Sequence, residues 1–171
     1  MKINTKVRYG LRTMIELGCH SNKEGLHQKD IAESQQLSEK YLDMIISSLK
    51  VAGLIINIGG KKSGYILNKS TKQITILDIF KAFEADPAIV PCINRPSVCE
   101  RSKNCPAQEY WEGLNNVITA YLKNAKLDTL VKRCKEMHGA SAKKVGGKQE
   151  SSSRRQRQYA VKKKEAAAEC S

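Results

Sequence analysis

The sequence predicts a mainly helical protein with one small β-hairpin, and three features indicate this fold class. Two short helical patterns, at residues 27–36 and 38–52, are separated by a tight turn. Two short runs typical of strands follow at residues 54–58 and 64–67, with the glycine-containing segment GGKKS between them. A long amphipathic pattern then runs from Pro106 to about Ala125. Helix, helix and hairpin in this order predict a winged helix-turn-helix domain, to which the long helix is appended.

The first helix is predicted at residues 5–19, because apolar residues recur there at helical spacing and Thr5 can serve as the N-cap. Four basic residues flank its start: Lys2, Lys6, Arg8 and Arg12. This flank suits either an ordinary solvated helix face or contact with phosphate groups.

The second helix of the pair is expected to begin after Ser38, a favoured N-cap residue, and to end before Gly53, which suits the left-handed position after a helix. Its inward face is predicted to be Tyr41 or Leu42, Ile45, Leu49 and Ala52. In a helix-turn-helix the second helix enters the major groove of DNA, and its first turn contacts base edges. The candidate DNA-contacting residues of the helix pair are Gln28, Ser38, Glu39, Lys40, Tyr41 and Asp43.

The hairpin that follows is predicted to be the wing. Lys61 and Lys62 lie at its tip, where they could contact phosphates or enter the minor groove. The alternative is a surface hairpin whose lysines only add solubility.

The charge balance favours an anionic partner. The chain carries 30 basic and 17 acidic residues, a formal net charge of +13, which is typical of proteins that bind nucleic acid and less often of proteins at membrane surfaces. No apolar run approaches the roughly 18 residues of a membrane span, and the N-terminus lacks the apolar core of a signal peptide. We therefore expect a soluble cytoplasmic protein that binds double-stranded DNA and no membrane. Residues 140–171 are basic and poor in large apolar residues, so they are expected to be disordered.

A fourth helix is predicted from Thr75, with a capping box to Asp78, up to the pair Asp86-Pro87. The long helix from Pro106 carries an apolar stripe, and a last short helix is expected at residues 127–137. The stripe consists of Trp111, Leu114, Val117 or Ile118, Tyr121 and Leu122. It could close the core of a single copy, but pairing with a second copy is the better interpretation, because a symmetric homodimer suits a palindromic DNA site.

Three cysteines lie close together in the segment CINRPSVCERSKNC, at Cys92, Cys99 and Cys105. Pro91 and Pro96 argue against a regular helix or strand here, so the segment is predicted to be a loop. Cysteine thiolates are soft ligands that suit zinc or an iron–sulfur cluster. Zinc sites commonly use tighter cysteine pairs, so the gaps of six and five residues favour an iron–sulfur cluster.

Three thiols leave one ligand position open, for which this chain offers Gln108, Glu109, Asp86 and His138, besides a residue of a second subunit. Two alternatives remain: unligated surface cysteines, or a thiol–disulfide switch without metal. Cys19 and Cys134 lie in helical patterns and are interpreted as packed thiols. The predicted organisation is a DNA-binding domain at 1–84, a cluster-binding loop at 85–105, dimerisation and C-terminal helices at 106–139, and the tail at 140–171.

Residues 1–137 resemble the bacterial transcription regulators of the IscR, NsrR and CymR type. The resemblance is carried by MKINTKVRYGLRTM, IAESQQLSEKYLDMIISSLKVAGLI, SGYIL, ITILDIFKAFE and CPAQEYWEGLNNVITAYL. It implies a homodimer of winged helix-turn-helix subunits with an iron–sulfur cluster on Cys92, Cys99 and Cys105. The cluster is usually 2Fe–2S, or 4Fe–4S in some nitric-oxide sensors, and its state alters promoter affinity. Regulators of the CymR kind lack the three cysteines and act through a partner protein.

The sequence departs from this pattern at four places. The first cysteine gap is six residues rather than five, and the wing has Ile58 where an arginine usually precedes the glycines. Gln108 stands where IscR has a ligating histidine, and Arg8 stands where NsrR has a ligating aspartate. The resemblance implies a repressor that senses iron–sulfur status, redox stress or nitric oxide; control by thiol oxidation or by a partner protein is the alternative. The sequence shows no nucleotide-binding loop, paired carboxylates or Ser/His/Asp set, so we expect no enzymatic activity.

Overall fold

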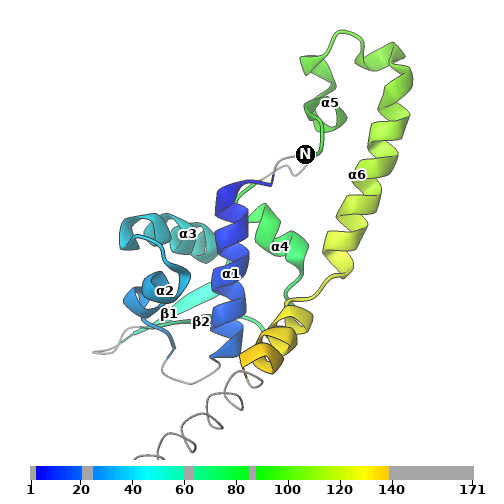
Figure 1. The fold of residues 1–171 in the computed structure, drawn as a ribbon. Coiled ribbons are helices and arrows are strands. Elements are labelled where there is room, and N and C mark those ends of the chain that lie inside the picture. The colour runs from blue at the N-terminus through cyan, green and yellow to red at the C-terminus, as the bar shows by residue number, and fades with distance from the viewer. Residues whose placement is uncertain (1–2, 21–24, 60–63, 85–87, 139–171) are drawn as a thin grey trace, which may run out of the picture. The chain divides into compact units, whose positions relative to one another are not determined.

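The computed structural model describes residues 3–20, 25–59, 64–84 and 88–138. The chain divides into two compact units, Met1–Lys132 and Arg133–Ser171. The first unit holds the helices α1 to α6 and the two strands, and residues 127–132 of it are also helical (Figure 1). In the second unit residues 133–138 are helical. The mainly helical fold with one hairpin is therefore as predicted.

The helix pair consists of α2 (Gln28–Gln35) and α3 (Glu39–Val51). Gln36 adopts the left-handed conformation, with φ of 55°, which ends α2 and makes the tight turn possible. The Ser38 hydroxyl accepts a hydrogen bond from the Tyr41 amide at 3.3 Å, and Gly53 follows α3 with φ of +66°. Both predicted ends of α3 are confirmed.

The hairpin pairs β1 (Ile55–Ile58) with β2 (Gly64–Leu67) in antiparallel register, from Ile55 opposite Leu67 to Ile58 opposite Gly64. Leu26, just before α2, exchanges two backbone hydrogen bonds with Tyr65, at 2.8 and 3.1 Å. Gly25 is required beside it, because its φ is +69° and a Cβ there would lie 2.9 Å from the Tyr65 carbonyl oxygen. The strand β2 is thus fixed to the segment just before α2, close to the turn end of the hairpin. Lys61 and Lys62, at the predicted tip, lie outside the described residues.

Helix α1 (Thr5–Cys19) packs against α2, α3, α4 and β2 and lies between the helix pair and α4 (Figure 1). Its Val7, Met14 and Leu17 are buried in one core with side chains from α3, the hairpin and α4. The helix has the predicted bounds, but its N-cap is Asn4 rather than Thr5, because the Asn4 side chain accepts the capping hydrogen bond from the Lys6 amide.

Helix α4 (Ile76–Lys81) begins with the predicted capping box: Asp78 N donates to Thr75 Oγ1, and Thr75 N donates to the Asp78 carboxylate. It ends at Lys81, earlier than the predicted Asp86-Pro87, because the chain turns after Ala82 and brings Phe83 against Gly10 of α1. The prediction that Ala52 faces inward is also wrong, since the helix ends there and Ile46 is buried in its place.

Helix α6 (Pro106–Asn124) has the predicted bounds, with Pro106 in its first turn, and it packs against α4 and α5 (Pro91–Asn94). None of its residues is buried in the single chain. The large side chains that remain exposed on it are Tyr110, Trp111, Leu114, Val117 and Tyr121. Among the described residues no helix is long and apolar enough to cross a membrane.

The chain that leaves α6 is fixed to the connector before α4 by three backbone hydrogen bonds. Ile76 N donates to Ala125 O at 2.9 Å, Leu127 N to Ile74 O at 3.0 Å and Asp128 N to Thr71 O at 3.1 Å. Leu127 and Val131 then join the core.

The Asp128 carboxylate strengthens this junction. It accepts a hydrogen bond from Thr71 Oγ1 at 3.1 Å and pairs with Lys132 at 2.9 Å. The Lys132 hydrogen bond, and with it the Thr71 bond, holds the pKa of Asp128 below its ordinary value. The contribution of Asp128 to stability is therefore present at neutral pH and is lost as the pH falls through the lowered pKa.

We expect Gly18→Ala to destabilise the first unit by about 1–3 kcal/mol, because a Cβ at Gly18 would lie 2.5 Å from Val131 Cγ2 in a closely packed core. Gly59→Ala is the matched control, since a Cβ there meets nothing within 4 Å. Urea denaturation of both variants measures the difference. Equal midpoints for Gly18→Ala and wild type would contradict the close packing of α1 against the helical segment at residues 127–132.

Candidate nucleic-acid interface and cysteine loop

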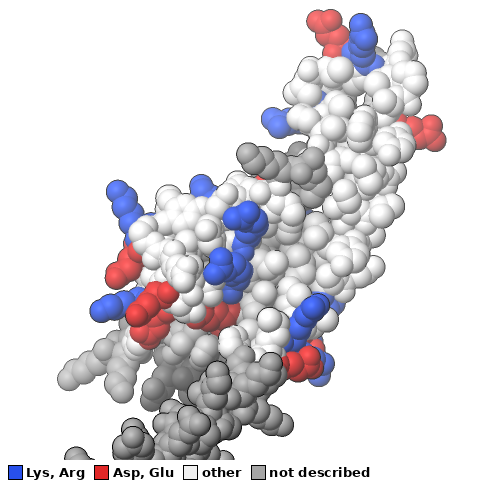
Figure 2. Space-filling view, viewed as in Figure 1, with Lys and Arg blue, Asp and Glu red and all other residues white. Residues whose placement is uncertain are grey.

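The outward face of α3 is polar over its first turn. Glu39, Lys40 and Asp43 are exposed, and the opposite face is held in the core by Leu42, Ile45 and Leu49. Figure 2 shows acidic and basic side chains mixed over α2 and α3, with basic side chains along the middle of α1. The structure thus leaves Glu39, Lys40 and Asp43 open on the first turns of α3, next to Gln28 of α2.

Gln28 connects the two helices of the pair. Its Nε2 donates to Asp43 Oδ1 at 2.7 Å and lies 3.4 Å from the Glu39 carbonyl oxygen. The bond holds the Asp43 carboxylate on the surface of α3 in one orientation, with its second oxygen still available. Gln28 therefore positions Asp43 in this structure.

Tyr41 is half-buried, and its ring packs edge-on against Tyr9 of α1, with 5.9 Å between the ring centroids. The guanidinium groups of Arg8 and Arg12 lie 5.9 and 5.4 Å from the centroid of Tyr9. These cation–π contacts hold both arginines beside α3. The basic flank of α1 is therefore an ordered surface next to the predicted reading helix.

Sequence reasoning missed two residues on the exposed face of α3, Met44 and Val51. Met44 is 47% exposed and Val51 is 88% exposed. Their spacing from Lys40, by four and eleven residues, places all three along the same side of the helix, a signal already present in the sequence.

The cysteine segment is more regular than the loop that was predicted. Cys92 lies in the short helix α5, Cys99 ends the 3-10 turn Pro96–Val98, and Cys105 is the N-cap residue of α6 after a second 3-10 turn, Ser102–Asn104. Pro91 and Pro96 each start one of these turns rather than preventing it, because the first turn of a helix needs no proline N–H.

All three thiols are half-buried and free. In the described part of the chain, no three side chains of His, Cys, Asp or Glu are grouped closely enough to hold a metal ion. The donor set itself, three soft thiols on short turns, suits an iron–sulfur cluster, which is larger than a single ion.

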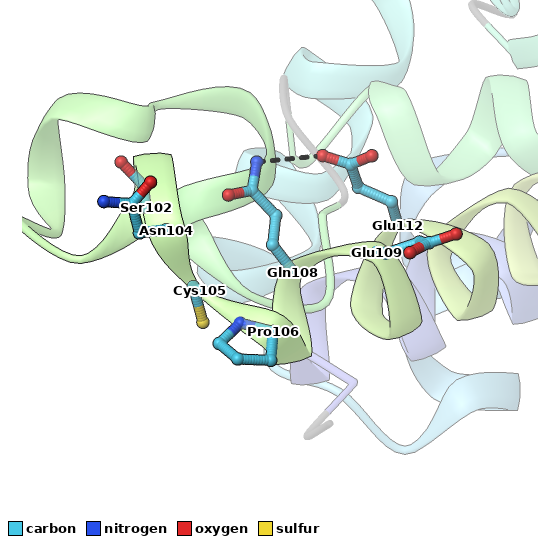
Figure 3. A pocket seen from close by; sticks show the side chains of 7 residues that line it. All are labelled: Ser102, Asn104, Cys105, Pro106, Gln108, Glu109 and Glu112. Carbon is cyan, nitrogen blue, oxygen red and sulfur yellow. Dashed lines mark hydrogen bonds between the residues drawn. The ribbon is translucent and has the colours of Figure 1, made fainter.

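A pocket of about 400 Å³ adjoins Cys105 at the start of α6. In Figure 3 the Gln108 amide points toward Glu112 and the Cys105 sulfur points away from it. Gln108 Nε2 donates to Glu112 Oε1 at 3.0 Å, so the amide oxygen of Gln108 is not used by this hydrogen bond. Of the other candidate ligands, Glu109 lines this pocket and Asp86 lies outside the described residues.

The remaining cysteines contact their own surroundings. The Cys19 thiol donates a long hydrogen bond, 3.8 Å, to the Val131 carbonyl, and Cys134 Sγ lies 3.4 Å from His138 Nδ1 in the second unit. Both thiols are half-buried, which agrees with their interpretation as packed cysteines.

A helix pair with a capped, polar-faced second helix, followed directly by an antiparallel hairpin, defines the winged helix-turn-helix class of DNA-binding proteins. Residues 3–133 match the family model Rrf2, described as an iron-dependent transcriptional regulator. The chain therefore belongs to the Rrf2 family of transcriptional regulators.

Two curated relatives show the range of similarity. The transcriptional regulator IscR of Pectobacterium atrosepticum is 30% identical over 131 residues, covering 77% of this chain and 79% of the relative. The protein rrf2 of Nitratidesulfovibrio vulgaris is 33% identical over 111 residues, covering 65% of this chain and 74% of the relative.

Solved structures of both kinds of regulator are similar to this one. CymR of B. subtilis, a global cysteine regulator, matches with a TM-score of 0.63 at 34% identity over 78% of this chain and 98% of CymR. IscR of T. potens matches with a TM-score of 0.64 at 28% identity over 80% of this chain and 90% of IscR. This chain is thus a transcriptional regulator of the IscR/CymR type.

We expect Ser38→Ala to lower the free energy of unfolding by about 1 kcal/mol, because it removes the N-cap of α3. Ser38→Asp should keep most of this stability, since a carboxylate also caps. Ser47→Ala, an exposed change within α3, is the control and should stay within about 0.5 kcal/mol of wild type. Chemical denaturation measures all three, and an unchanged Ser38→Ala would show that the cap does not stabilise α3.

Proposed function

We propose that this regulator binds promoter DNA with an affinity controlled by an iron–sulfur cluster on Cys92, Cys99 and Cys105. The observation that carries the proposal is the position of three half-buried free thiols between α4 and α6, in a chain of a family described as iron-dependent. The protein represses transcription in the cytoplasm, and the signal that it senses is iron–sulfur status, redox stress or nitric oxide. The proposed organisation keeps residues 1–84 for DNA, 85–105 for the cluster and 106–139 for the dimer.

The DNA-contacting surface is the exposed face of α3 together with the wing. On α3 this surface includes Ser38, Glu39, Lys40, Tyr41 and Asp43, and Gln28 of α2 orients Asp43. Lys61 and Lys62 contact the backbone from the wing. Since a cation at the backbone releases counterions, binding weakens as the salt concentration rises.

The cluster supplies a centre that oxidants or nitric oxide can alter or remove. The three thiols hold it as thiolates, and the 2Fe–2S form is favoured over 4Fe–4S. The fourth ligand is Gln108 or Glu109 at the start of α6, or a residue of the second subunit. A weak ligand at that position makes the cluster labile, which suits a sensor.

The DNA-binding form is a homodimer joined through α6. Tyr110, Leu114, Val117 and Tyr121 recur at helical spacing, and all are exposed in the single chain. A helix of 19 residues that buries none of them needs a partner surface. A second α6 provides one, and two reading helices related by twofold symmetry suit a palindromic site.

Protein purified without oxygen should be brown, with visible absorption bands and matching iron and sulfide contents, and Cys99→Ala should lose both. Cys134→Ala is the matched control, because that half-buried thiol lies outside the proposed site, and it should keep the colour. The ratio of iron to subunit separates the two cluster types. Wild-type protein that stays colourless after reconstitution with iron and sulfide would rule out the cluster.

Val117→Asp should convert the dimer to a monomer and weaken binding to palindromic DNA, because it places a charge in the apolar stripe of α6. Asn116→Asp adds the same charge to an exposed neighbour outside the stripe and should stay dimeric. Sedimentation equilibrium measures both. A Val117→Asp variant with the mass of the wild-type dimer would remove α6 from the proposed interface.

A cluster-free mechanism is the second candidate, and one comparison favours it. The oxidised form of Staphylococcus aureus CymR has a solved structure, 32% identical to this chain over 77% of it and 96% of CymR, with a TM-score of 0.62. In this alternative, oxidation of the loop thiols or a partner protein controls DNA binding. Colourless protein whose DNA affinity changes with thiol reductants would support it.

A further inference from the structure

The side of α3 that lies opposite the core is a single line of residues. Leu42, Ile45, Ile46 and Leu49 are buried, and at 100° per residue the positions that point directly away from them are 40, 44, 47 and 51. Lys40, Met44, Ser47 and Val51 occupy these positions, and all are exposed. When α3 enters the major groove of DNA, the side chains of this line reach furthest into the groove.

Met44 is the large apolar residue of this line within the first two turns of α3. It follows Lys40 by one turn and Asp43 by one residue, so its neighbours on the surface are charged, yet 47% of its own surface is open to water. The exposed part of Met44 is therefore available to contact an apolar group on a molecule that binds α3.

We propose that Met44 is a specificity-determining residue that packs on the C5 methyl group of a thymine in the major groove. This inference rests on the proposed DNA-binding function and names part of the sequence that it recognises. The thymine methyl is the one apolar group among the base edges of the major groove, and apolar side chains read it by contact. Met44 is one turn into α3, where side chains still reach base edges.

The surroundings of Met44 favour DNA over an apolar protein surface. Asp43 beside it is fixed by Gln28 at 2.7 Å, and Lys40 precedes it on the same line, so a docking protein would have to cover two charges for one apolar contact. Val51 is seven residues further on, about 10 Å along the helix, and does not extend Met44 into one patch. Base edges offer a methyl group among polar atoms, which matches this arrangement.

The test begins with selection of binding sites from a random-sequence duplex library by the full chain, purified without oxygen, in its cluster-containing and apo forms. Each thymine of the enriched site is then replaced singly by deoxyuridine, which pairs identically and lacks only the methyl group. At one thymine in each half-site the wild type should lose about fourfold in affinity, the value for one methyl group taken from water.

Met44→Gln should bind thymine and deoxyuridine duplexes equally, because it keeps the length of the side chain and removes its apolar end. Ser47→Ala, a change on the same line of α3, should keep the fourfold difference. Circular dichroism tests whether both variants fold, and Met44→Ala, which also removes the apolar end of the side chain, replaces Met44→Gln if that variant does not.

The possible failures are distinguishable. A wild type that enriches no sequence would overturn the proposed function, and this inference with it. A wild type that enriches a site but tolerates deoxyuridine at every thymine would overturn the role of Met44 alone. Methyl dependence that persists in Met44→Gln would overturn it as well.

Discussion

The short ladder between residues 71–76 and 125–128 is the constraint on which the rest of this fold depends. Without it α6 would be held to the winged domain only by its packing against α4 and by the segment after α4, because no residue of α6 is fully buried. Three backbone hydrogen bonds and the Thr71–Asp128–Lys132 contacts fix the end of α6 where Leu127 and Val131 enter the core beside α1. A change in α6 therefore acts on the connector before α4 and on α1, the helix against which the reading helix packs.

The reading helix is ordered before any DNA is present. Ser38 caps it, Gln28 orients Asp43, and Tyr41 packs on Tyr9, which in turn lies beneath two arginines. Each of these contacts removes freedom that a DNA contact would otherwise have to restrict on binding. Several residues that the sequence predicted to contact DNA thus also stabilise this surface, so on the proposed function substitutions there affect stability and binding together.

Local signals predicted most of the elements correctly. Ser38 and Gly53 mark the two ends of α3, the Thr75–Asp78 capping box starts α4, and Pro106 starts α6, because caps and proline act within a single turn.

The errors in the predicted elements have tertiary causes. Helix α4 stops early because Phe83 turns toward Gly10 of α1, a contact across more than 70 residues that no local pattern contains. The prolines of the cysteine segment were interpreted as breakers, yet they start short turns that carry Cys92 and precede Cys99. For the candidate site, the sequence predicted the polar face of α3. It did not single out Met44, whose outward position becomes clear once the residues buried on the opposite face of α3 are known.

Cys105 has two roles that connect the proposed cluster to this framework. It is the last thiol of the segment, and it is also the N-cap residue of α6, where its carbonyl accepts the amide of Gln108 at 3.0 Å. A metal bond to its sulfur would restrict the side-chain torsions of Cys105 and so would constrain the residue from which α6 begins. Because the backbone at Ala125 is hydrogen-bonded to Ile76, a change at the start of α6 is passed to the packing of α6 on α4 and, on the proposed function, to its packing on a second α6. On the proposed function, gain or loss of the cluster thus shifts the balance between two arrangements of α6, and the distance between the two reading heads follows from it.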